Sequence, residues 1–528
     1  MSGVPQEPPP ALTKADLTEL GTTDANTVLG GTAWSTITAL VPPIQTLVVS
    51  VVAARFLGTE GFGQQSLIAF VSISCSYVLA ARMPAALSRF GAQLVGAGEP
   101  GMLRELYRRT VRTQIVVGAV LLLAFGGLAA AGADPSAAWI LAGFATFAAV
   151  IQAAPAALLT ATQRWRDNVI PGTITTLVAS VVMIGVLAAG GGVAGYFAVD
   201  VAMVVANLFW TRRLARRISM RLPDPTPIEP VLRAEFRTFI RASTFFAVVE
   251  FVVLNRSEIL FLNHFSTAAQ VGFYSIAFAA SEAVARFPQI LTNVALPAVA
   301  NLHGAGEHER IRNGYWRAIR FLAALCPPLV VAAAIFGSDL IGVVYGAKFV
   351  PAEPVVVILL VPYLLLPMAG LSDALLWTFG RIRFLVITGV LATVVDIGAA
   401  LILVPRYDAI GAAIASDLGA LTAGLPALWL VVGLMRPIHL GGRLLRNHLL
   451  VTVATGVCAA VPVVFLGGIP GLVVGIPASA AAVWFLGGRL GLLDRGDGAW
   501  LDDATGHRLG GRVASLIRHF SVPVPDRA

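Results

Sequence analysis

Residues 114–132 read QIVVGAVLLLAFGGLAAAG, and Gln114 is the only strongly polar side chain among them. A helix needs about 20 apolar residues to cross the hydrocarbon core of a bilayer, so this stretch predicts a transmembrane helix. A cluster of cations precedes it and marks one of its ends. The cluster consists of Arg104, Arg108, Arg109 and Arg112.

Thirteen further apolar runs share this length and composition. Together, the runs predict an all-α polytopic membrane protein of about fourteen transmembrane helices. Only a Gly-Gly turn at 467–468 separates the last two. The fourteen runs lie at 28–54, 63–88, 114–132, 137–161, 169–188, 193–211, 242–262, 271–300, 318–336, 355–379, 384–404, 409–435, 449–467 and 469–488.

The composition excludes a soluble enzyme. Hydrophobic residues make up 57% of the chain and charged residues 12%, and the mean hydropathy is +0.80. A soluble domain usually carries about 25% charged residues. The net charge of +8 does not indicate nucleic-acid binding, because the basic residues lie between the apolar runs and form no single basic face. No nucleic-acid partner is expected.

The basic residues fall on alternate connections between the runs. Counted with the N-terminus in the cytosol, 30 of the 37 Lys and Arg residues lie in cytosolic segments, three (Arg55, Lys348 and Arg406) on the opposite side, and four within runs. Cytoplasmic loops of membrane proteins carry such an excess of basic residues. The sequence therefore predicts a multi-pass protein of the cytoplasmic (inner) membrane with both termini in the cytosol.

Short motifs of the first half of the chain return in the second half in the same order. Because both halves contain six runs of the same orientation, we predict two pseudo-symmetric six-helix lobes related by a parallel repeat, an architecture of transporters. The GAGE motif at 96–99 returns at 304–307, Arg104, Tyr107 and Arg109 return as Arg312, Tyr315 and Arg317, Arg164-Trp165-Arg166 returns as Arg381-Ile382-Arg383, and Gly195 returns as Gly411.

These patterns divide the chain into six parts. The C-terminal part contains Val513, Leu516, Ile517 and Phe520 at helical spacing, which predicts a short helix on the membrane surface. The parts are a cytosolic tail at 1–27, an N-lobe at 28–215, a basic cytosolic linker at 216–239, a C-lobe at 240–435, two extra helices at 436–488 and a cytosolic C-terminal tail at 489–528.

Four motifs in succession point to a known family. VGFY at 271–274 opens an apolar run that ends near Pro297, the second GAGE loop follows, and GRIR at 380–383 precedes VPRYDAIGAA at 404–413. In order and spacing this succession resembles the polysaccharide-export, O-antigen flippase-like branch of the multidrug/oligosaccharidyl-lipid/polysaccharide (MOP) flippase superfamily. The resemblance covers about residues 28–488.

The resemblance implies a function without covalent chemistry. In that family two lobes enclose a central cavity and move a polyprenyl-diphosphate-linked oligosaccharide across the membrane for cell-surface polysaccharide biosynthesis, by alternating access. It implies membrane lipids as surroundings, and a glycan polymerase or glycosyltransferases of the same pathway as candidate partners. No cofactor and no catalytic or metal-binding residues are expected. Asp396 departs from the family pattern, because a neutral residue such as Asn is expected there.

Eleven ionisable residues fall within the apolar runs, and each would cost about 2.5–3.5 kcal/mol at the bilayer centre. Most must therefore face a wet cavity or pair within the protein. Glu282 and Arg286, four residues apart, have the spacing of an ion pair, and Asp200 and Asp417 occupy nearly equivalent places in the two lobes. The candidates for lining a substrate cavity are Arg82, Arg89, Glu250, Arg256, Glu258 and Arg286, and those for binding a coupling ion are Asp373 and Asp396.

Two alternatives stay open at this point. The first is an ion-coupled exporter of drugs or metabolites on the same scaffold. The second is a membrane-embedded glycosyltransferase or polymerase, against which the short outer loops and the parallel repeat argue. The sequence identifies neither the sugar nor the coupling ion.

Overall fold

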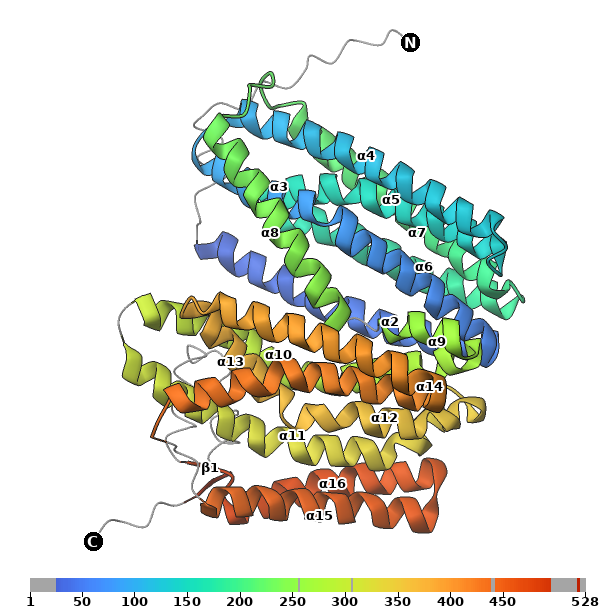
Figure 1. The fold of residues 1–528 in the computed structure, drawn as a ribbon, viewed down its shortest axis with the longest axis vertical. Helices are drawn as coiled ribbons and strands as arrows, with labels where there is room; N and C mark the ends of the chain where they lie inside the picture. Colours follow the sequence, from blue (N-terminus) through green and yellow to red (C-terminus); the bar gives the residue numbers. More distant parts are fainter. Residues whose placement is uncertain (1–24, 255–256, 305–306, 438–441, 495–519, 523–528) are drawn as a thin grey trace. The chain divides into compact units, whose positions relative to one another are not determined.

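The computed structural model describes residues 25–254, 257–304, 307–437, 442–494 and 520–522 (Figure 1). At residues 25–46, 245–254 and 289–304 it describes the helical backbone only. The predicted surface helix around Val513–Ile517 and the tail at 1–24 lie outside the described residues. Contacts divide the chain into two units, Met1–Phe251 and Val252–Ala528, and each is described by itself.

Unit 1 is built from long helices. A π-helical segment, Ser76–Ala80, joins the first two of them, and the last helix continues into unit 2. The helices are α2 (Ala25–Cys75), α3 (Arg82–Gly96), α4 (Pro100–Ala130), α5 (Ser136–Ala161), α6 (Trp165–Ala188), α7 (Gly192–Ser219) and α8 (Pro230–Leu254).

Unit 2 is also helical, apart from two short strands that pair in parallel, β1 (Leu493–Asp494) and β2 (Ser521–Val522). Two 3₁₀ segments, Ala347–Ala352 and Val361–Leu364, flank a short helix. The helices are α9 (Glu258–Phe265), α10 (Ala268–Gly304), α11 (His308–Val344), α12 (Glu353–Leu360), α13 (Leu366–Thr378), α14 (Ile382–Leu434), α15 (Gly442–Leu466) and α16 (Gly468–Leu490).

The all-α polytopic prediction is confirmed. Ten helical segments of the described residues are long and apolar enough to cross a membrane. Over their described residues, all fourteen predicted runs coincide with helical segments. Helix α14 carries two runs, α2 carries one run and the start of the next, and α8 and α10, whose side chains are described only in part, carry two more. The number of crossings, the lobe boundaries and the pseudo-symmetry remain predictions.

Two of the long helices contain a sharp reversal of the chain. At Gly58 in α2 the backbone has φ 72°, and at Asp408 in α14 it has φ 50°. Both values lie in the left-handed region, which Gly, Asn and Asp adopt more readily than other residues. Gly58 follows the first predicted run and Asp408 follows the eleventh. Both reversals therefore lie in connections that the sequence predicts.

Small residues form the interior of unit 1. Helix α5 packs against α4 and α7, and its buried positions include Ala138, Ala142, Ala145 and Ala157. At Gly143 of the same helix, an added Cβ would lie 2.7 Å from the Cβ of Phe125. Lipid tails are as apolar as the helix side chains, so the hydrophobic effect does not bring helices together in a membrane. Small side chains favour association instead, because they allow helix backbones to approach closely.

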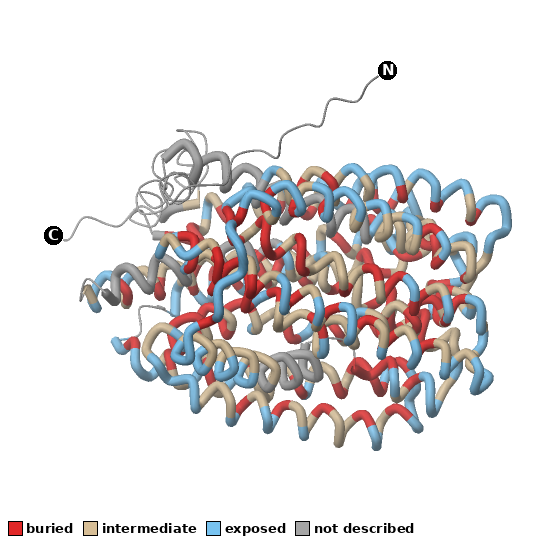
Figure 2. The backbone as a smooth tube through the Cα atoms, turned by 90° about the horizontal axis from the view of Figure 1, so that it is seen from above, coloured by how far each residue is buried: buried red, intermediate tan, exposed pale blue. Residues whose placement is uncertain are grey.

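Large apolar side chains lie on the outside of both units. Leu123 of α4 is 75% exposed and Phe465 of α15 is 81% exposed, and exposed and buried positions alternate along most helices (Figure 2). A soluble protein rarely exposes so much apolar surface. Lipid tails would cover these side chains, so the burial pattern fits a multi-pass membrane protein.

The arginine-rich connections of unit 1 meet at one end. A single apolar cluster there joins Phe90 of α3, Leu103 of α4, Leu158 of α5 and Ala215 of α7. The opposite end holds a second cluster around Phe125, Trp139 and Phe197. The charge asymmetry found along the sequence therefore corresponds to the two ends of one helical bundle.

Candidate functional site

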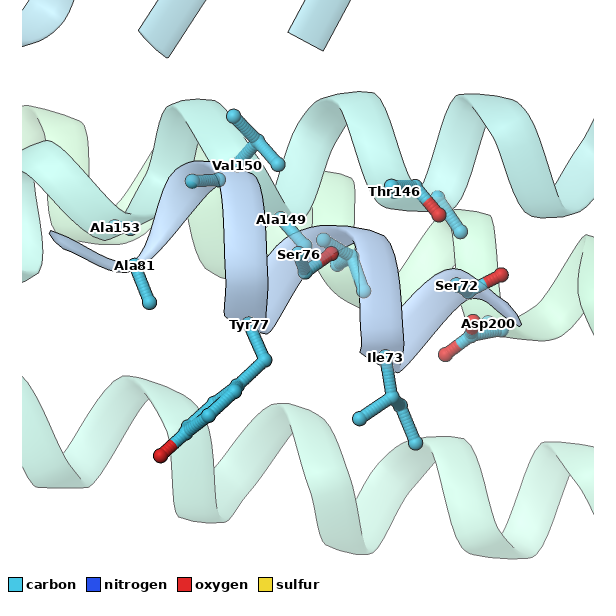
Figure 3. Close-up of a pocket in the computed structure, with 13 residues that line it drawn as sticks. Ser72, Ile73, Ser76, Tyr77, Ala81, Thr146, Ala149, Val150, Ala153 and Asp200 are labelled. Carbon is cyan, nitrogen blue, oxygen red and sulfur yellow. The ribbon is translucent and has the colours of Figure 1, made fainter. Parts of the chain in front are cut away.

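Unit 1 contains a pocket whose walls are mostly apolar and whose polar lining consists of hydroxyl groups and one carboxylate, here called the hydroxyl pocket. Its polar lining is Ser72, Ser76, Tyr77, Thr146 and Asp200, and its volume is about 450 Å³. Figure 3 shows Ser72, Thr146 and Asp200 at one end of the pocket and Tyr77 at the other. Helices α2, α5 and α7 and the π-helical segment supply these side chains.

The π-helical segment shapes this pocket. The amide of Ala81 donates to the carbonyl of Ser76 at 3.0 Å, a five-residue spacing that widens the helix by one residue. Single π-helical turns inside α-helices occur frequently at functional sites. Thr146, which is 3% exposed, has a buried hydroxyl oxygen with no hydrogen-bond partner among the described residues. The pocket therefore offers an unused polar group next to Asp200.

Arg82 is not a lining residue of the hydroxyl pocket but contacts Tyr77, which lines one end of it. Its guanidinium carbon is 4.5 Å from the centre of the Tyr77 ring, and Nη2 donates to the Tyr77 carbonyl at 3.5 Å. The Nε atom is buried without a hydrogen-bond partner, and no carboxylate of the described part of unit 1 pairs with Arg82. A cation with one unused donor thus stacks on Tyr77 at one end of the hydroxyl pocket.

Arg89 has different surroundings from Arg82. It is exposed, and its guanidinium carbon lies 5.0 Å from the ring centre of Phe239 and 5.4 Å from that of Phe90. The structure thus places these two candidates in separate environments, although they lie seven residues apart.

Unit 2 contains a pocket lined by several carboxyl groups, here called the acidic pocket. Glu282, Asp373 and Asp417 line it together with Ser416 and Tyr363, and its volume is about 390 Å³. Helices α10, α13 and α14 supply the three carboxylates. Three acids around one cavity favour a positively charged occupant.

Glu282 also makes the ion pair that its spacing to Arg286 predicts. The Arg286 Nη2 lies 3.3 Å from Oε2 of Glu282, and both side chains are partly exposed. This pair neutralises part of the charge at the rim of the acidic pocket. Asp373 and Asp417 have no ion-pair partner within the described portion of the chain.

Two further carboxyl groups of unit 2 are buried together. Glu258 and Asp396 are each 2% exposed and interact through their side chains. The Tyr274 hydroxyl donates to Oε2 of Glu258 at 2.7 Å, and the Ser257 hydroxyl donates to Oδ2 of Asp396 at 3.2 Å. Acidic residues buried within a membrane-spanning helical bundle commonly mark the paths of ions or protons. The pair is therefore a candidate for binding a proton or a cation.

The buried carboxyls connect to the acidic pocket through one hydroxyl. Ser416 lines that pocket and also hydrogen-bonds with Tyr274, the residue that donates to Glu258. Asp373 and Asp396, which the sequence analysis grouped as coupling candidates, therefore belong to two neighbouring but distinct surroundings in unit 2.

Two predicted site residues cannot be placed. Arg256 lies outside the described residues, and Glu250 lies in α8 where only the backbone is described. The hydroxyl groups of Ser257, Tyr274 and Thr146 were not among the site residues predicted from the sequence. A polar residue within an apolar run is their only sequence signal, and it does not distinguish them from hydroxyls that bond to their own helix.

The described residues contain no group of three or more His, Cys, Asp or Glu side chains positioned to hold a metal ion. What the two pockets offer chemically is recognition: hydroxyl groups with the single carboxylate of Asp200 in unit 1, and three carboxyl groups in unit 2.

Comparisons with known proteins agree with this picture. The sequence profile described as polysaccharide biosynthesis protein matches residues 52–354. No curated protein matches the chain. Among solved structures, an inward closed form of the lipid II flippase MurJ has a TM-score of 0.67 at 10% identity, over 86% of this chain and 97% of that one.

Two other solved structures share the fold. An inward-facing multidrug resistance MATE family transporter of the MOP superfamily has a TM-score of 0.60 at 15% identity, over 75% of this chain and 96% of that one. A MOP superfamily transporter from Pyrococcus furiosus has a TM-score of 0.52 at 16% identity, over 80% of this chain and 99% of that one.

The helical bundles, their lipid-facing surfaces and their polar pockets define a class, the polytopic membrane proteins with the fold of the MOP superfamily. Within that class, the chain belongs to the polysaccharide biosynthesis protein family. The resemblance found in the sequence motifs is confirmed.

Proposed function

We propose that the protein is a flippase that moves a polyprenyl-diphosphate-linked oligosaccharide across the cytoplasmic membrane by alternating access of its two units. The observation that carries this proposal is the stacking of Arg82 on Tyr77, which lines one end of the hydroxyl pocket. An Arg guanidinium matches the oxygens of a diphosphate with a planar fork of donors. The hydroxyls and the Asp200 carboxylate match the donors and acceptors of a sugar.

The acidic groups of unit 2 suit a different task. We assign the binding of a coupling cation or proton to Asp373 in the acidic pocket and to Asp396 with Glu258 in the buried pair. A flippase needs a driving force. An ion that binds one conformation of the protein more tightly than the other can supply it, because its binding shifts the equilibrium between the two conformations. Arg89, Glu250, Arg256 and Arg286 remain candidates for the path of the substrate.

Arg82 provides the decisive test. Arg82→Ala should abolish flipping of a lipid-linked oligosaccharide while the amount of protein in the membrane stays normal, and Arg82→Lys should restore flipping only in part, because Lys lacks the planar fork. Flipping and abundance are measured in the same cells. If Arg82 instead balanced a buried acid, its loss would cost about 3–5 kcal/mol and reduce abundance. Normal flipping by Arg82→Ala would refute the assignment.

The proposed orientation can be tested by labelling single cysteines in a background that lacks Cys75, Cys326 and Cys458. Asp134 and Asp224 are both exposed and lie at opposite ends of unit 1. With both termini in the cytosol, a membrane-impermeant reagent added outside should label Asp134→Cys and leave Asp224→Cys unmodified. The reverse pattern would contradict the orientation.

A second candidate function is the export of a cationic drug or metabolite. The acidic pocket favours it, because Glu282, Asp373 and Asp417 would attract such a substrate. Uptake of a fluorescent cation into inverted vesicles distinguishes the two candidates. Transport of the free cation, inhibited by Asp373→Asn and insensitive to Arg82→Ala, would replace the flippase proposal.

The proposal includes no covalent step and no cofactor. A glycan polymerase or glycosyltransferases of the same pathway are the partners that a flippase of this kind would serve. A purified protein that elongates a glycan by itself would overturn this part of the proposal.

A further inference from the structure

The arginine-rich end of unit 1 contains another cavity, separate from the hydroxyl pocket. It lies between α3, α4 and the first half of α8 and has a volume of about 260 Å³. Phe90, Leu94, Leu106, Leu232 and Phe236 form its apolar walls. Among the described residues that line it, the charged ones are all basic, and they are Arg109, Arg233 and Arg237.

The walls of this cavity are held by aromatic packing. The ring of Phe90 on α3 lies 5.6 Å from that of Phe236 and 5.7 Å from that of Phe239, both on α8. Leu232 and Ile240 pack against the same apolar cluster. The first half of α8 is therefore amphipathic, with an apolar face on α3 and arginines beside it.

The three arginines differ in how many of their N–H groups have a hydrogen-bond or ion-pair partner. Arg109 pairs with Glu105, with Nε 2.7 Å from Oε1. Arg233 donates through Nη2 to the carbonyl of Ile228 at 3.3 Å, but its buried Nε has no partner. Arg237 is exposed and makes no ion pair with any described residue. The cavity thus keeps positive charge and unused donors beside an apolar interior.

We propose that this cavity binds an anionic phospholipid. The arginines would hold the phosphate, and the apolar walls would take the glycerol and the first part of an acyl chain. Basic pockets between membrane helices bind the head groups of anionic lipids in this way. The volume lies below the roughly 300–1,000 Å³ of sites that enclose a drug-sized ligand, so the rest of the lipid remains in the bilayer.

Such a lipid would act where the chain leaves unit 1. Helix α8 continues into unit 2, and the segment before it is already fixed, because Arg104 donates to the carbonyls of Leu222 and Pro223 at 3.0 Å. A lipid bridging α8 and α3 would add contacts at the same place and stabilise the connection.

Native mass spectrometry of the purified full-length protein tests the proposal. Titration with dioleoyl phosphatidylglycerol should give saturable binding of one tight lipid, and dioleoyl phosphatidylcholine should bind far more weakly. The double variant Arg233→Gln/Arg237→Gln should lower the affinity for phosphatidylglycerol about 30-fold, from the contribution of two arginines near a lipid surface. Arg241→Gln, on the same helix but not in the lining, is the matched control and should change it less than about twofold.

Three results would overturn the proposal. The first is equal binding of both lipids, and the second is an equal loss with Arg241→Gln, which would indicate a diffuse surface charge. The third is equal competition by inorganic phosphate or by the short-chain dihexanoyl lipid, which would show that the apolar walls play no part. If the double variant unfolds at a lower temperature, Arg237→Gln alone, at an exposed position, provides the measurement with an expected loss of about fivefold.

Discussion

The hydroxyl pocket of unit 1 and the acidic pocket of unit 2 hold Asp200 and Asp417, which occupy nearly equivalent places in the repeated sequence. Asp200 lies among Ser72, Ser76 and Thr146, whereas Asp417 shares its cavity with Asp373 and Glu282. The two halves of the chain therefore place a carboxylate in similar positions and surround it with different chemistry. We infer a division of tasks, with substrate recognition in unit 1 and ion binding in unit 2.

The repeated glycines provide the largest expected difference between the units. A Cβ added at Gly411 would collide with the backbone carbonyl of Leu403, whereas one added at Gly195 would lie 2.9 Å from Cγ1 of Val186, the movable end of a side chain. Overpacking costs typically 1–3 kcal/mol, so Gly411→Ala should destabilise by about 3 kcal/mol or more and Gly195→Ala by about 1 kcal/mol. Thermal unfolding of the purified variants measures both, and equal shifts would show that the two connections are equally tight.

The acids of the two pockets should differ in their effect on coupling. Asp373→Asn should weaken the dependence of flipping on a sodium or proton gradient about tenfold, within the 5–150-fold typical of coupled sites. Asp200→Asn should keep the gradient dependence and reduce flipping about fivefold, from one lost hydrogen bond. Proteoliposomes with imposed gradients separate the two effects. A loss of coupling in Asp200→Asn would remove the division of tasks.

Hydroxyl groups should matter more in unit 2 than in unit 1. Tyr274→Phe removes the donor to the buried Glu258, and hydrogen bonds between membrane helices average about 0.6 kcal/mol with a maximum of about 1.7 kcal/mol. We expect a loss of about 1 kcal/mol. Ser72→Ala removes a hydroxyl that donates to the Ile68 carbonyl of its own helix at 2.9 Å, and should cost under about 0.5 kcal/mol. Unfolding in denaturant compares them, and a larger loss for Ser72→Ala would reverse the comparison.

The smallest effect is expected at the rim of the acidic pocket. Glu282 and Arg286 form a partly exposed pair, and such pairs contribute about 0–1 kcal/mol. Arg286→Gln should therefore leave the unfolding temperature nearly unchanged. Flipping measured on the same variant sharpens the result, because a marked loss of flipping without a loss of stability would mean that Arg286 contacts the substrate.

The helical part of the fold could be predicted because its causes are local. A stretch such as 114–132 must form a helix in a bilayer, since every backbone polar group has to be satisfied within the segment. The turn where α15 meets α16 also has a local cause. Gly467 and Gly468 adopt φ values of 59° and 49° there, and the sequence predicts the last turn at these two glycines.

The candidate site could be predicted only as a set of residues. The cost of a charge in a membrane identified Asp373, Asp396 and Glu258 without showing their neighbours. Ser257 and Asp396 are 139 positions apart in the chain, yet their side chains form a hydrogen bond. No periodicity within one helix contains that information.

The sequence by itself determined the membrane class, the helical segments, the charge asymmetry between the two ends and the family. Those properties depend on composition and on spacings within one helix. The tertiary structure alone decided that Asp373 lines the acidic pocket while Asp396 is buried near Glu258. It also decided that Arg82 stacks on Tyr77 while Arg89 packs on Phe239. The surroundings of a side chain are set by which helices pack together, and that packing depends on small residues such as those of α5 that are far apart in the chain.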